Sequence, residues 1–137
     1  MADPRRAVAV LVALRATGIG VSVDDFGTGN ASIEYLAQLP ATEIKIDRLF
    51  ITDILEDPWA QAIVRSTIDL ARNLELTVVA EGIETEAALS HLIELGCDTG
   101  QGYLISRPQP ADALTAILKP ASPRYRRSRA STRRWPN

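Results

Sequence analysis

The chain of 137 residues has little of the residue types that form disulfides and histidine metal sites. It contains one cysteine, Cys97, and one histidine, His91. A single cysteine excludes an internal disulfide and fits a reducing compartment, so we predict a cytoplasmic location. Cys97 follows Gly96 at a predicted helix end, which favours a buried, inert thiol. His91 has no partner at metal-ligand spacing, and we assign neither residue a function.

The sequence also lacks a long apolar run. No stretch of about 18 consecutive apolar residues occurs, which is the length that a membrane-spanning helix needs. Arg5-Arg6 precede an apolar run from Ala7 to Leu14, a pattern shared with secretion signals, but Arg15 ends the run early. A helix capped by Asp3 explains this segment better.

Charge is distributed unevenly along the chain. The net charge is −2, but Lys119–Asn137 holds seven basic residues and no acidic ones, so the preceding part carries eight basic and seventeen acidic side chains. The apolar period also ends after Pro120. We therefore predict one domain over residues 1–118 and a basic, disordered tail over residues 119–137. Binding of nucleic acid or an anionic membrane through this tail is the less favoured alternative.

Two adjacent carboxylates lie in the N-terminal third of the chain. Asp24 and Asp25 follow a predicted apolar strand, Ile19–Val23, and precede Gly27-Thr28-Gly29. Where a strand gives way to a glycine turn, both side chains can project from the same end, and a divalent metal would relieve their repulsion. The alternative is that one Asp begins a turn and the other caps the following helix.

Four strand-then-helix units follow one another. Besides Ile19–Val23, we predict strands at Thr42–Asp47, Leu76–Ala80 and Gly102–Ile105. The predicted helices are Pro4–Ala16, a short one ending near Leu39-Pro40, a long one opened by Asp57-Pro58, one capped by Thr85 and stopped by Gly96, and Ala111–Leu118. This alternation implies an α/β fold with parallel strands and right-handed crossovers.

Polar side chains that could act in catalysis or bind a metal lie at or beside the ends of these strands. They are Asp24, Asp25, Lys45, Glu81 and Gln101. In an α/β barrel the carboxyl ends of all strands open on one face, where the active site is built. We therefore expect these residues, although spread along the sequence, to meet in one cleft.

With these residues assembled, the sequence resembles the C-terminal half of the EAL family of bacterial cyclic di-GMP phosphodiesterases. Four motifs carry the resemblance, in the family's order and spacing: Asp24-Asp25-Phe26-Gly27-Thr28-Gly29, Lys45-Ile46-Asp47, Val78-Val79-Ala80-Glu81-Gly82-Ile83-Glu84-Thr85 and Gln101-Gly102-Tyr103-Leu104. The resemblance as a whole covers nearly everything from Leu11 to Leu114. Four ordered motifs form a specific signal, whereas each motif alone is weak.

The resemblance implies a fold and a reaction. The fold is a TIM-barrel-type arrangement of (βα) units, roughly 250 residues in the family, of which this chain would supply the last four strands as a half barrel. The reaction is metal-dependent hydrolysis of one phosphodiester bond of cyclic di-GMP, which gives linear pGpG. No Gly-Gly-Asp-Glu-Phe cyclase signature occurs.

The resemblance also implies roles for individual residues. Asp24 would bridge two Mg²⁺ or Mn²⁺ ions, and Asp25 and Glu81 would hold the second ion. Lys45 would help to position or activate the attacking water, and Gln101 would hydrogen-bond near it. The predicted metal ligands are thus Asp24, Asp25 and Glu81, and the predicted catalytic residues are Lys45, Glu81 and Gln101.

The sequence departs from the family's pattern in features that bear on activity. The signature Glu-Ala-Leu tripeptide is absent, and so are the upstream asparagine and glutamate that complete the first metal site. Asn30-Ala31 replaces the usual Tyr-Ser, and Glu84 would fasten the loop that contains them. We therefore expect a truncated domain with little activity alone, holding one weakly bound ion and associating with a second copy or a partner chain that completes the barrel.

Two other functions remain open. A catalytically degenerate module could bind cyclic di-GMP or a protein partner without hydrolysis. A phosphate-binding metabolic enzyme could use Gly27-Thr28-Gly29 to cradle a phosphate, but this hypothesis leaves Lys45 and the adjacent aspartates unexplained.

Overall fold

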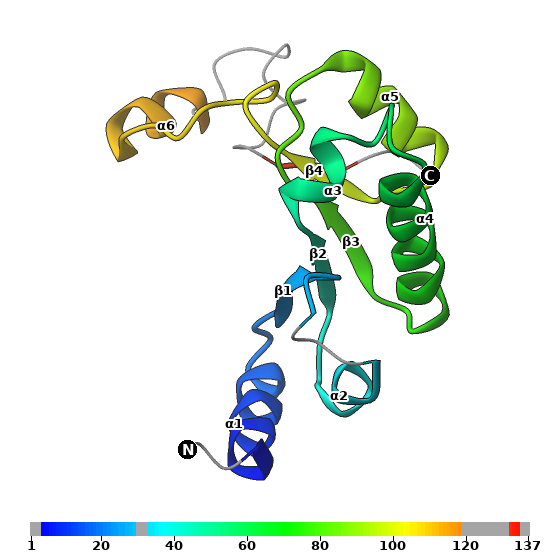
Figure 1. Ribbon diagram of the computed structural model, residues 1–137. Coiled ribbons are helices and arrows are strands. Elements are labelled where there is room, and N and C mark those ends of the chain that lie inside the picture. The colour runs from blue at the N-terminus through cyan, green and yellow to red at the C-terminus, as the bar shows by residue number, and fades with distance from the viewer. Residues whose placement is uncertain (1–3, 30–32, 119–131, 135–137) are drawn as a thin grey trace.

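The computed structural model describes residues 4–29, 33–118 and 132–134 of the chain. Its elements form a crescent (Figure 1). In chain order they are α1 (Pro4–Ala16), β1 (Ser22–Phe26), α2 (Ile33–Gln38), β2 (Glu43–Ile46), α3 (Arg48–Thr52), α4 (Pro58–Asn73), β3 (Thr77–Ala80), α5 (Glu86–Glu94), β4 (Thr99–Gln101), α6 (Ala111–Leu118) and β5 (Thr132–Arg134). None of the described helices is both long enough and apolar enough to span a bilayer.

The strands form one sheet in the order β1-β2-β3-β4-β5. The first four strands are parallel, and β5 pairs antiparallel with β4. The prediction of four parallel strands in an α/β fold is therefore confirmed. Because parallel strands share one direction, the carboxyl ends of β1, β2, β3 and β4 lie along the same edge of the sheet.

The core lies between the centre of the sheet and the helices α4 and α5. Its fully buried side chains are Ile44, Ile46, Ile51, Ile54, Val64, Ile68, Val78, Ile83 and Leu92. Complete burial of such a side chain contributes about 1.5–3 kcal/mol. By contrast, none of the described side chains of α1 and α6 is buried, and these two helices occupy the ends of the crescent (Figure 1). The sheet centre is thus the stable frame from which the strand ends project.

Helix ends follow the predicted capping signals. The Asp57 carboxylate accepts a hydrogen bond from the Trp59 N–H at 2.9 Å, with Pro58 in the first turn of α4. Thr85 accepts a hydrogen bond from the Ala88 N–H at 3.2 Å. Gly96 follows α5 with a φ of 85°, a left-handed conformation that glycine adopts without a steric cost. These local signals place α4 and α5 where the sequence predicts them.

Two strand predictions need correction. The predicted strand Ile19–Val23 is displaced, since β1 runs from Ser22 to Phe26 and Ile19 is exposed. The predicted strand Gly102–Ile105 is wrong, because β4 ends at Gln101 and the following residues turn, with the Ile105 N–H donating to Gly102 O at 3.0 Å. The apolar residues after Gly102 suggested a strand, whereas Thr99 and Gly100 are small enough to fit the buried position beside β3.

Two elements were not predicted. Asp47 caps α3 by accepting a hydrogen bond from the Leu49 N–H at 2.7 Å, but a helix of five residues is too short to show a helical period. The strand β5 lies where the sequence predicts a disordered tail. The remainder of that tail, the predicted cap Asp3 and the substituted Asn30-Ala31 lie outside the described residues.

Candidate metal centre and adjoining cavity

A β-bulge in β1 brings Asp24 and Asp25 together. Val23 pairs with Ile44 and Phe26 pairs with Ile46, so the two aspartates oppose the single residue Lys45. Neighbouring residues of a regular strand point to opposite faces, and a bulge removes that alternation locally. Asp25 has a φ of 51°, a left-handed conformation that is uncommon outside glycine.

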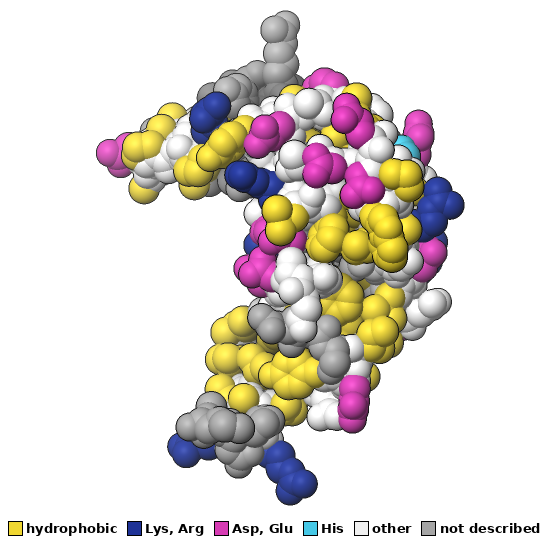
Figure 2. Space-filling model, in the orientation of Figure 1, with side chains coloured by type: hydrophobic (Ala, Val, Ile, Leu, Met, Phe, Trp, Pro, Cys, Tyr) yellow, Lys and Arg dark blue, Asp and Glu magenta, His cyan; other side chains and the backbone are white. Residues whose placement is uncertain are grey.

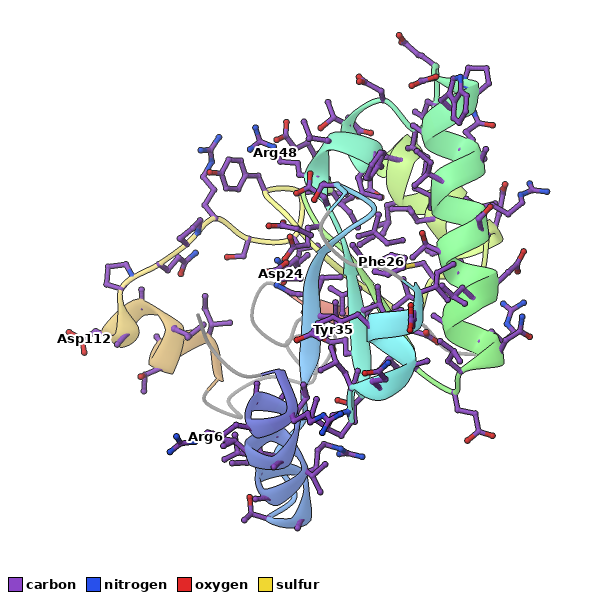
Figure 3. The ribbon with its side chains drawn as sticks, turned by 60° about the horizontal axis from the view of Figure 1, so that its bottom comes forward. Arg6, Asp24, Phe26, Tyr35, Arg48 and Asp112 are labelled. Atoms are coloured by element: carbon purple, nitrogen blue, oxygen red, sulfur yellow. The ribbon has the colours of Figure 1, made fainter. Side chains whose placement is uncertain are left out.

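The rest of β1 keeps its normal orientation. Phe26 is buried and lies on the side of α4, whereas Asp24 lies on the other side of the strand (Figure 3). The Asp24 carboxylate accepts a hydrogen bond from the Asp25 N–H at 3.0 Å, which fixes the two residues relative to each other. The bulge thus anchors one side chain in the core and turns both carboxylates outward.

Glu81 completes a group of three carboxylates. One oxygen each from Asp24, Asp25 and Glu81 lies within 4.8 Å of the others. Glu81 directly follows β3, and its backbone N–H donates to Ile46 O at 3.1 Å, which places it beside the end of β2. Carboxylate oxygens are the ligands that Mg²⁺ and Mn²⁺ prefer, so this donor set fits a divalent ion.

The crowding of acidic groups perturbs Asp25. A hydrogen bond with the Asp47 side chain is the largest cause that raises the pKa of Asp25, and the neighbouring charge of Asp24 raises it further. A divalent cation would oppose this effect, because it stabilises the ionised carboxylates. Asp47 was predicted only as a strand end. The signal that could have revealed its hydrogen bond with Asp25 is its place two residues after Lys45, on the same side of a strand.

Lys45 and Gln101 both bind Glu81. Lys45 Nζ forms an ion pair and a hydrogen bond with Glu81 Oε1, and Gln101 Nε2 donates to the same oxygen at 2.7 Å. The side chains of Lys45 and Glu81 are only 24% and 18% exposed, so this ion pair is better shielded than a surface pair. The hydrogen bond to Glu81 raises the pKa of Lys45, which keeps its ammonium protonated.

The five residues expected to converge therefore form one connected group. Lys45 and Gln101 both donate to Oε1 of Glu81, and Glu81 shares the carboxylate group with Asp24 and Asp25. Acidic side chains gather on the concave side of the crescent (Figure 2). Glu84 was expected to fasten the loop after Asp25. In the described part of that loop, Gly27–Gly29, no residue forms a hydrogen bond or ion pair with Glu84, and residues 30–32 lie outside the described part of the chain.

A cavity of about 400 Å³ adjoins this group. It is lined by Arg48, Glu81, Gly82, Glu84, Gln101, Gly102, Tyr103, Ser106 and Pro108. The Arg107 guanidinium lies 4.4 Å from the centroid of the Tyr103 ring. Sequence reasoning missed the participation of Arg48 and Tyr103, although Arg48 directly follows the Lys45-Ile46-Asp47 motif and Tyr103 belongs to the motif of Gln101.

Gly82 and Gly102, which both line the cavity, lie close to other atoms. A Cβ on Gly82, whose φ is 74°, would lie 2.2 Å from Arg48 Cγ. A Cβ on Gly102 would lie 2.2 Å from Ile83 O and 2.3 Å from Ile83 N. These backbone atoms are engaged, since the Ile83 N–H donates to Gln101 O at 3.0 Å and Leu104 N–H donates to Ile83 O at 3.1 Å. Both positions therefore require the absence of a side chain.

Comparison with known proteins identifies related chains. A family model described as the EAL domain matches residues 1–108. The bifunctional diguanylate cyclase/cyclic di-GMP phosphodiesterase MucR of Pseudomonas aeruginosa is 48% identical over 118 residues, which are 86% of this chain and 17% of MucR. The chain thus spans about a sixth of the length of that curated relative.

Two solved structures show the same fold at high sequence identity. The c-di-GMP complex of the PaMucR phosphodiesterase matches with a TM-score of 0.76 and 48% identity, over 83% of this chain and 46% of that one. The manganese/cy-diGMP complex of Klebsiella pneumoniae BlrP1 matches with a TM-score of 0.67 and 39% identity, over 73% and 26% of the two chains.

Proposed function

The chain belongs to the EAL domain family, and we propose that it carries part of a metal-dependent phosphodiesterase site that hydrolyses cyclic di-GMP to linear pGpG. One observation supports the proposal above all others: oxygens of Asp24, Asp25 and Glu81 lie close enough together to bind one divalent ion. The similar structure of BlrP1 is a complex with manganese and the dinucleotide, which supports Mn²⁺ or Mg²⁺ as the ion.

The surrounding side chains suit phosphodiester hydrolysis. When bound, a divalent ion lowers the pKa of a water ligand and neutralises charge on the phosphate. Lys45 and Gln101 hold the Glu81 carboxylate in one orientation through its Oε1 atom. Because Lys45 is protonated, it serves as a hydrogen-bond donor and a positive charge for the attacking water or the phosphate, not as a proton acceptor.

We further propose that one ion binds per chain and that hydrolysis is slow. Among the residues that the structure describes, Asp24, Asp25 and Glu81 are the one acidic group with the geometry for an ion. Two-metal phosphodiesterases use the second ion to stabilise the leaving oxygen. A site with one ion lacks that contribution, which is why non-hydrolytic binding of cyclic di-GMP is the second candidate function.

Calorimetry and product analysis test the proposal. Titration of the purified chain with MnCl₂ should show one site per chain, and EDTA should abolish it. With Mn²⁺ and cyclic di-GMP, chromatography should detect pGpG at a rate well below the 1–10³ per second that is typical of enzymes. Absence of Mn²⁺ binding would contradict the metal site. Dinucleotide binding without product would favour the binding module, and product at an ordinary enzymatic rate would contradict the one-ion proposal.

Asp25→Asn is a matched variant for the metal site. Asn tolerates the left-handed backbone at this position, so the substitution removes charge without adding strain. We expect Mn²⁺ affinity to fall at least about tenfold. In EDTA at neutral pH the variant should melt at a higher temperature than the wild type. An amide can keep the hydrogen bond with Asp47, which is the largest cause of the raised pKa of Asp25, and Asp24 does not repel it.

The pH dependence of this difference has a defined sign. A raised pKa in the folded state means that protonated Asp25 favours folding, so the wild type gains stability as the pH falls through that pKa. The variant has no such gain, and the two melting temperatures should converge toward the ordinary Asp pKa of about 3.9. A variant less stable than the wild type in EDTA at neutral pH would contradict the repulsion.

We also propose that the chain associates with a second copy or a partner chain. Val10 of α1, Ile19 before β1 and Ile33 of α2 are 54%, 51% and 63% exposed, and apolar side chains cover this part of the surface in Figure 2. Such exposure is typical of interaction surfaces. Sedimentation velocity should detect a dimer, and a monomer with little binding of an apolar dye would contradict the proposal.

The cytoplasmic location stays a prediction.

A further inference from the structure

We propose that the outer edge of β4 is a docking site for an extended strand, which β5 occupies within the chain and which the β1 end of a second copy occupies when β5 is displaced. The inference rests on the association proposed above, and it assigns the edge where association takes place and the segment that controls it. Strand β5 pairs with every residue of β4, through Thr99 with Arg134, Gly100 with Arg133 and Gln101 with Thr132.

The four parallel strands would have two open edges without β5. The sheet order is β1-β2-β3-β4-β5, so β1 and β4 are the outer parallel strands. Among the described strands β1 pairs with β2 alone, which leaves its other edge open. An open edge presents unpaired N–H and C=O groups, to which another strand can add. Strand β5 therefore caps the sheet at β4 and leaves the edge of β1 available.

The contact between β5 and β4 is short enough to be exchanged. It consists of three residue pairs, at the lower limit of strand length, and a pair of isolated strands is only marginally stable in water. Thirteen residues, 119–131, connect α6 with β5. A segment held by a connection of this length has an effective concentration on the order of millimolar. The tether thus keeps β5 on the edge, and a competing strand at comparable local concentration can replace it.

The β1 end of a second copy suits the edge of β4. Each copy has four parallel strands, and β1 of one copy can extend the sheet of another beyond β4 in the same direction. If both copies pair in this way, four strands from each make the eight that close an α/β barrel. Exposed apolar side chains of α1 and α2, Val10 and Ile33, lie at the β1 end of the crescent and would be covered by the contact (Figure 1).

The docking edge belongs to a strand of the candidate metal centre. Gln101 pairs with β5 through its backbone, and its side chain donates to Glu81 Oε1 at 2.7 Å. In a closed barrel the carboxyl ends of all parallel strands open on one face. Pairing of two copies would therefore bring both candidate metal centres to the same face of one barrel. Strand β5 controls whether this arrangement forms.

A full-length double variant, Arg133→Pro with Arg134→Pro, tests the cap. Successive N–H groups of a strand point to opposite sides, so one of these two donates toward β4, and proline removes it. Arg133→Ala with Arg134→Ala is the matched control, because it loses the same charge and keeps both N–H groups. Sedimentation over a concentration series should show self-association of the proline variant at least about tenfold tighter than that of the wild type, as expected if β5 fills the edge for about nine-tenths of the time or more. The alanine variant should match the wild type.

Amide hydrogen exchange identifies what occupies the edge. In the wild type, protection of Thr99–Gln101 should not depend on protein concentration, because β5 belongs to the same chain. In the proline variant this protection should rise with concentration, together with that of Ser22–Phe26 in β1. A synthetic peptide of residues 130–137, added at millimolar concentration, should return the proline variant to the association of the wild type.

The outcomes separate the cap from the earlier proposals. Equal association of the proline and alanine variants, unchanged protection of β4 in the proline variant, or no effect of the peptide would overturn the inference. A monomeric wild type with an associating proline variant would refute association of the wild type and leave the cap intact. A dimeric wild type that the prolines do not alter would refute the cap alone. Binding of Mn²⁺ and release of pGpG test the metal centre separately.

Discussion

Gly102→Ala is expected to lower the free energy of unfolding by about 3 kcal/mol, the upper end of the usual cost of overpacking. The added Cβ would lie 2.2–2.3 Å from the backbone oxygen and nitrogen of Ile83. Backbone atoms cannot move aside as a side chain can, so the hydrogen bonds that Ile83 forms with Gln101 and Leu104 must break or lengthen. Thermal denaturation should show a melting temperature lower by roughly 10 °C.

Gly20→Ala is the matched control for this substitution. Its Cβ would meet one side-chain atom, Thr42 Oγ1, at 3.3 Å, and Gly20 does not have a positive φ. The same change of residue type should therefore cost less than about 1 kcal/mol. Urea denaturation of both variants separates close backbone approach from the general effect of replacing glycine. Gly102→Ala with the stability of Gly20→Ala would show that Ile83 does not pack against Gly102 as the structure indicates.

Lys45→Met is expected to lower the rate of Mn²⁺-supported pGpG release by about 10²–10³-fold, which is the usual cost of removing one preorganised donor from a reaction centre. Methionine keeps the length of the apolar stem but has no ammonium. Glu81 Oε1 would retain only the hydrogen bond from Gln101 Nε2. The rate should be measured under single-turnover conditions, with the chain in excess over cyclic di-GMP.

Metal affinity separates a chemical role of Lys45 from a structural one. Loss of a positive charge beside Glu81 should leave Mn²⁺ affinity unchanged or higher, because the ammonium and the ion repel each other. Arg15→Met, at the exposed end of α1, is the control for loss of one positive charge and should leave both quantities unchanged. A variant that loses Mn²⁺ binding along with its rate would show that Lys45 holds Glu81 in place and has no separate part in the reaction.

Local signals explain why much of the fold could be predicted. The helix α4 shows a proline, a capping aspartate and an apolar stripe within its own sequence, and α5 shows Thr85 and Gly96 at its two ends. Both ends of β2 and of β3 lie within one residue of the predicted boundaries Thr42–Asp47 and Leu76–Ala80. These features depend on residues a few positions apart, which is the range over which sequence patterns act.

Features that depend on distant residues could not be predicted. The bulge at Asp24 and Asp25 exists only because β1 pairs with β2 in a shifted register, and neither strand shows this alone. The strand β4 pairs with β3 through Thr99 and Gly100 and with β5 as far as Gln101, while the apolar residues after Gly102 form a turn. In both cases tertiary pairing overrides the local preference.

In the candidate site, too, some features could be predicted from the sequence and others could not. Parallel strands force their carboxyl ends to one edge, so the meeting of Asp24, Lys45, Glu81 and Gln101 could be predicted from topology. The cavity could not be predicted, because it forms where the start of α3, the segment after β3 and the segment at the end of β4 come together. Arg48 and Tyr103 become neighbours of Glu84 only through that packing.

The antiparallel strand β5 has a consequence for the nascent chain. Residues 132–134 are translated after all four parallel strands, yet they pair with Thr99–Gln101. Folding can begin at the N-terminal part of a chain while synthesis continues, so the outer edge of β4 stays open until residues 132–134 have left the ribosome. A polypeptide released early, just beyond α6, would keep that open edge permanently and would recruit strands from other molecules.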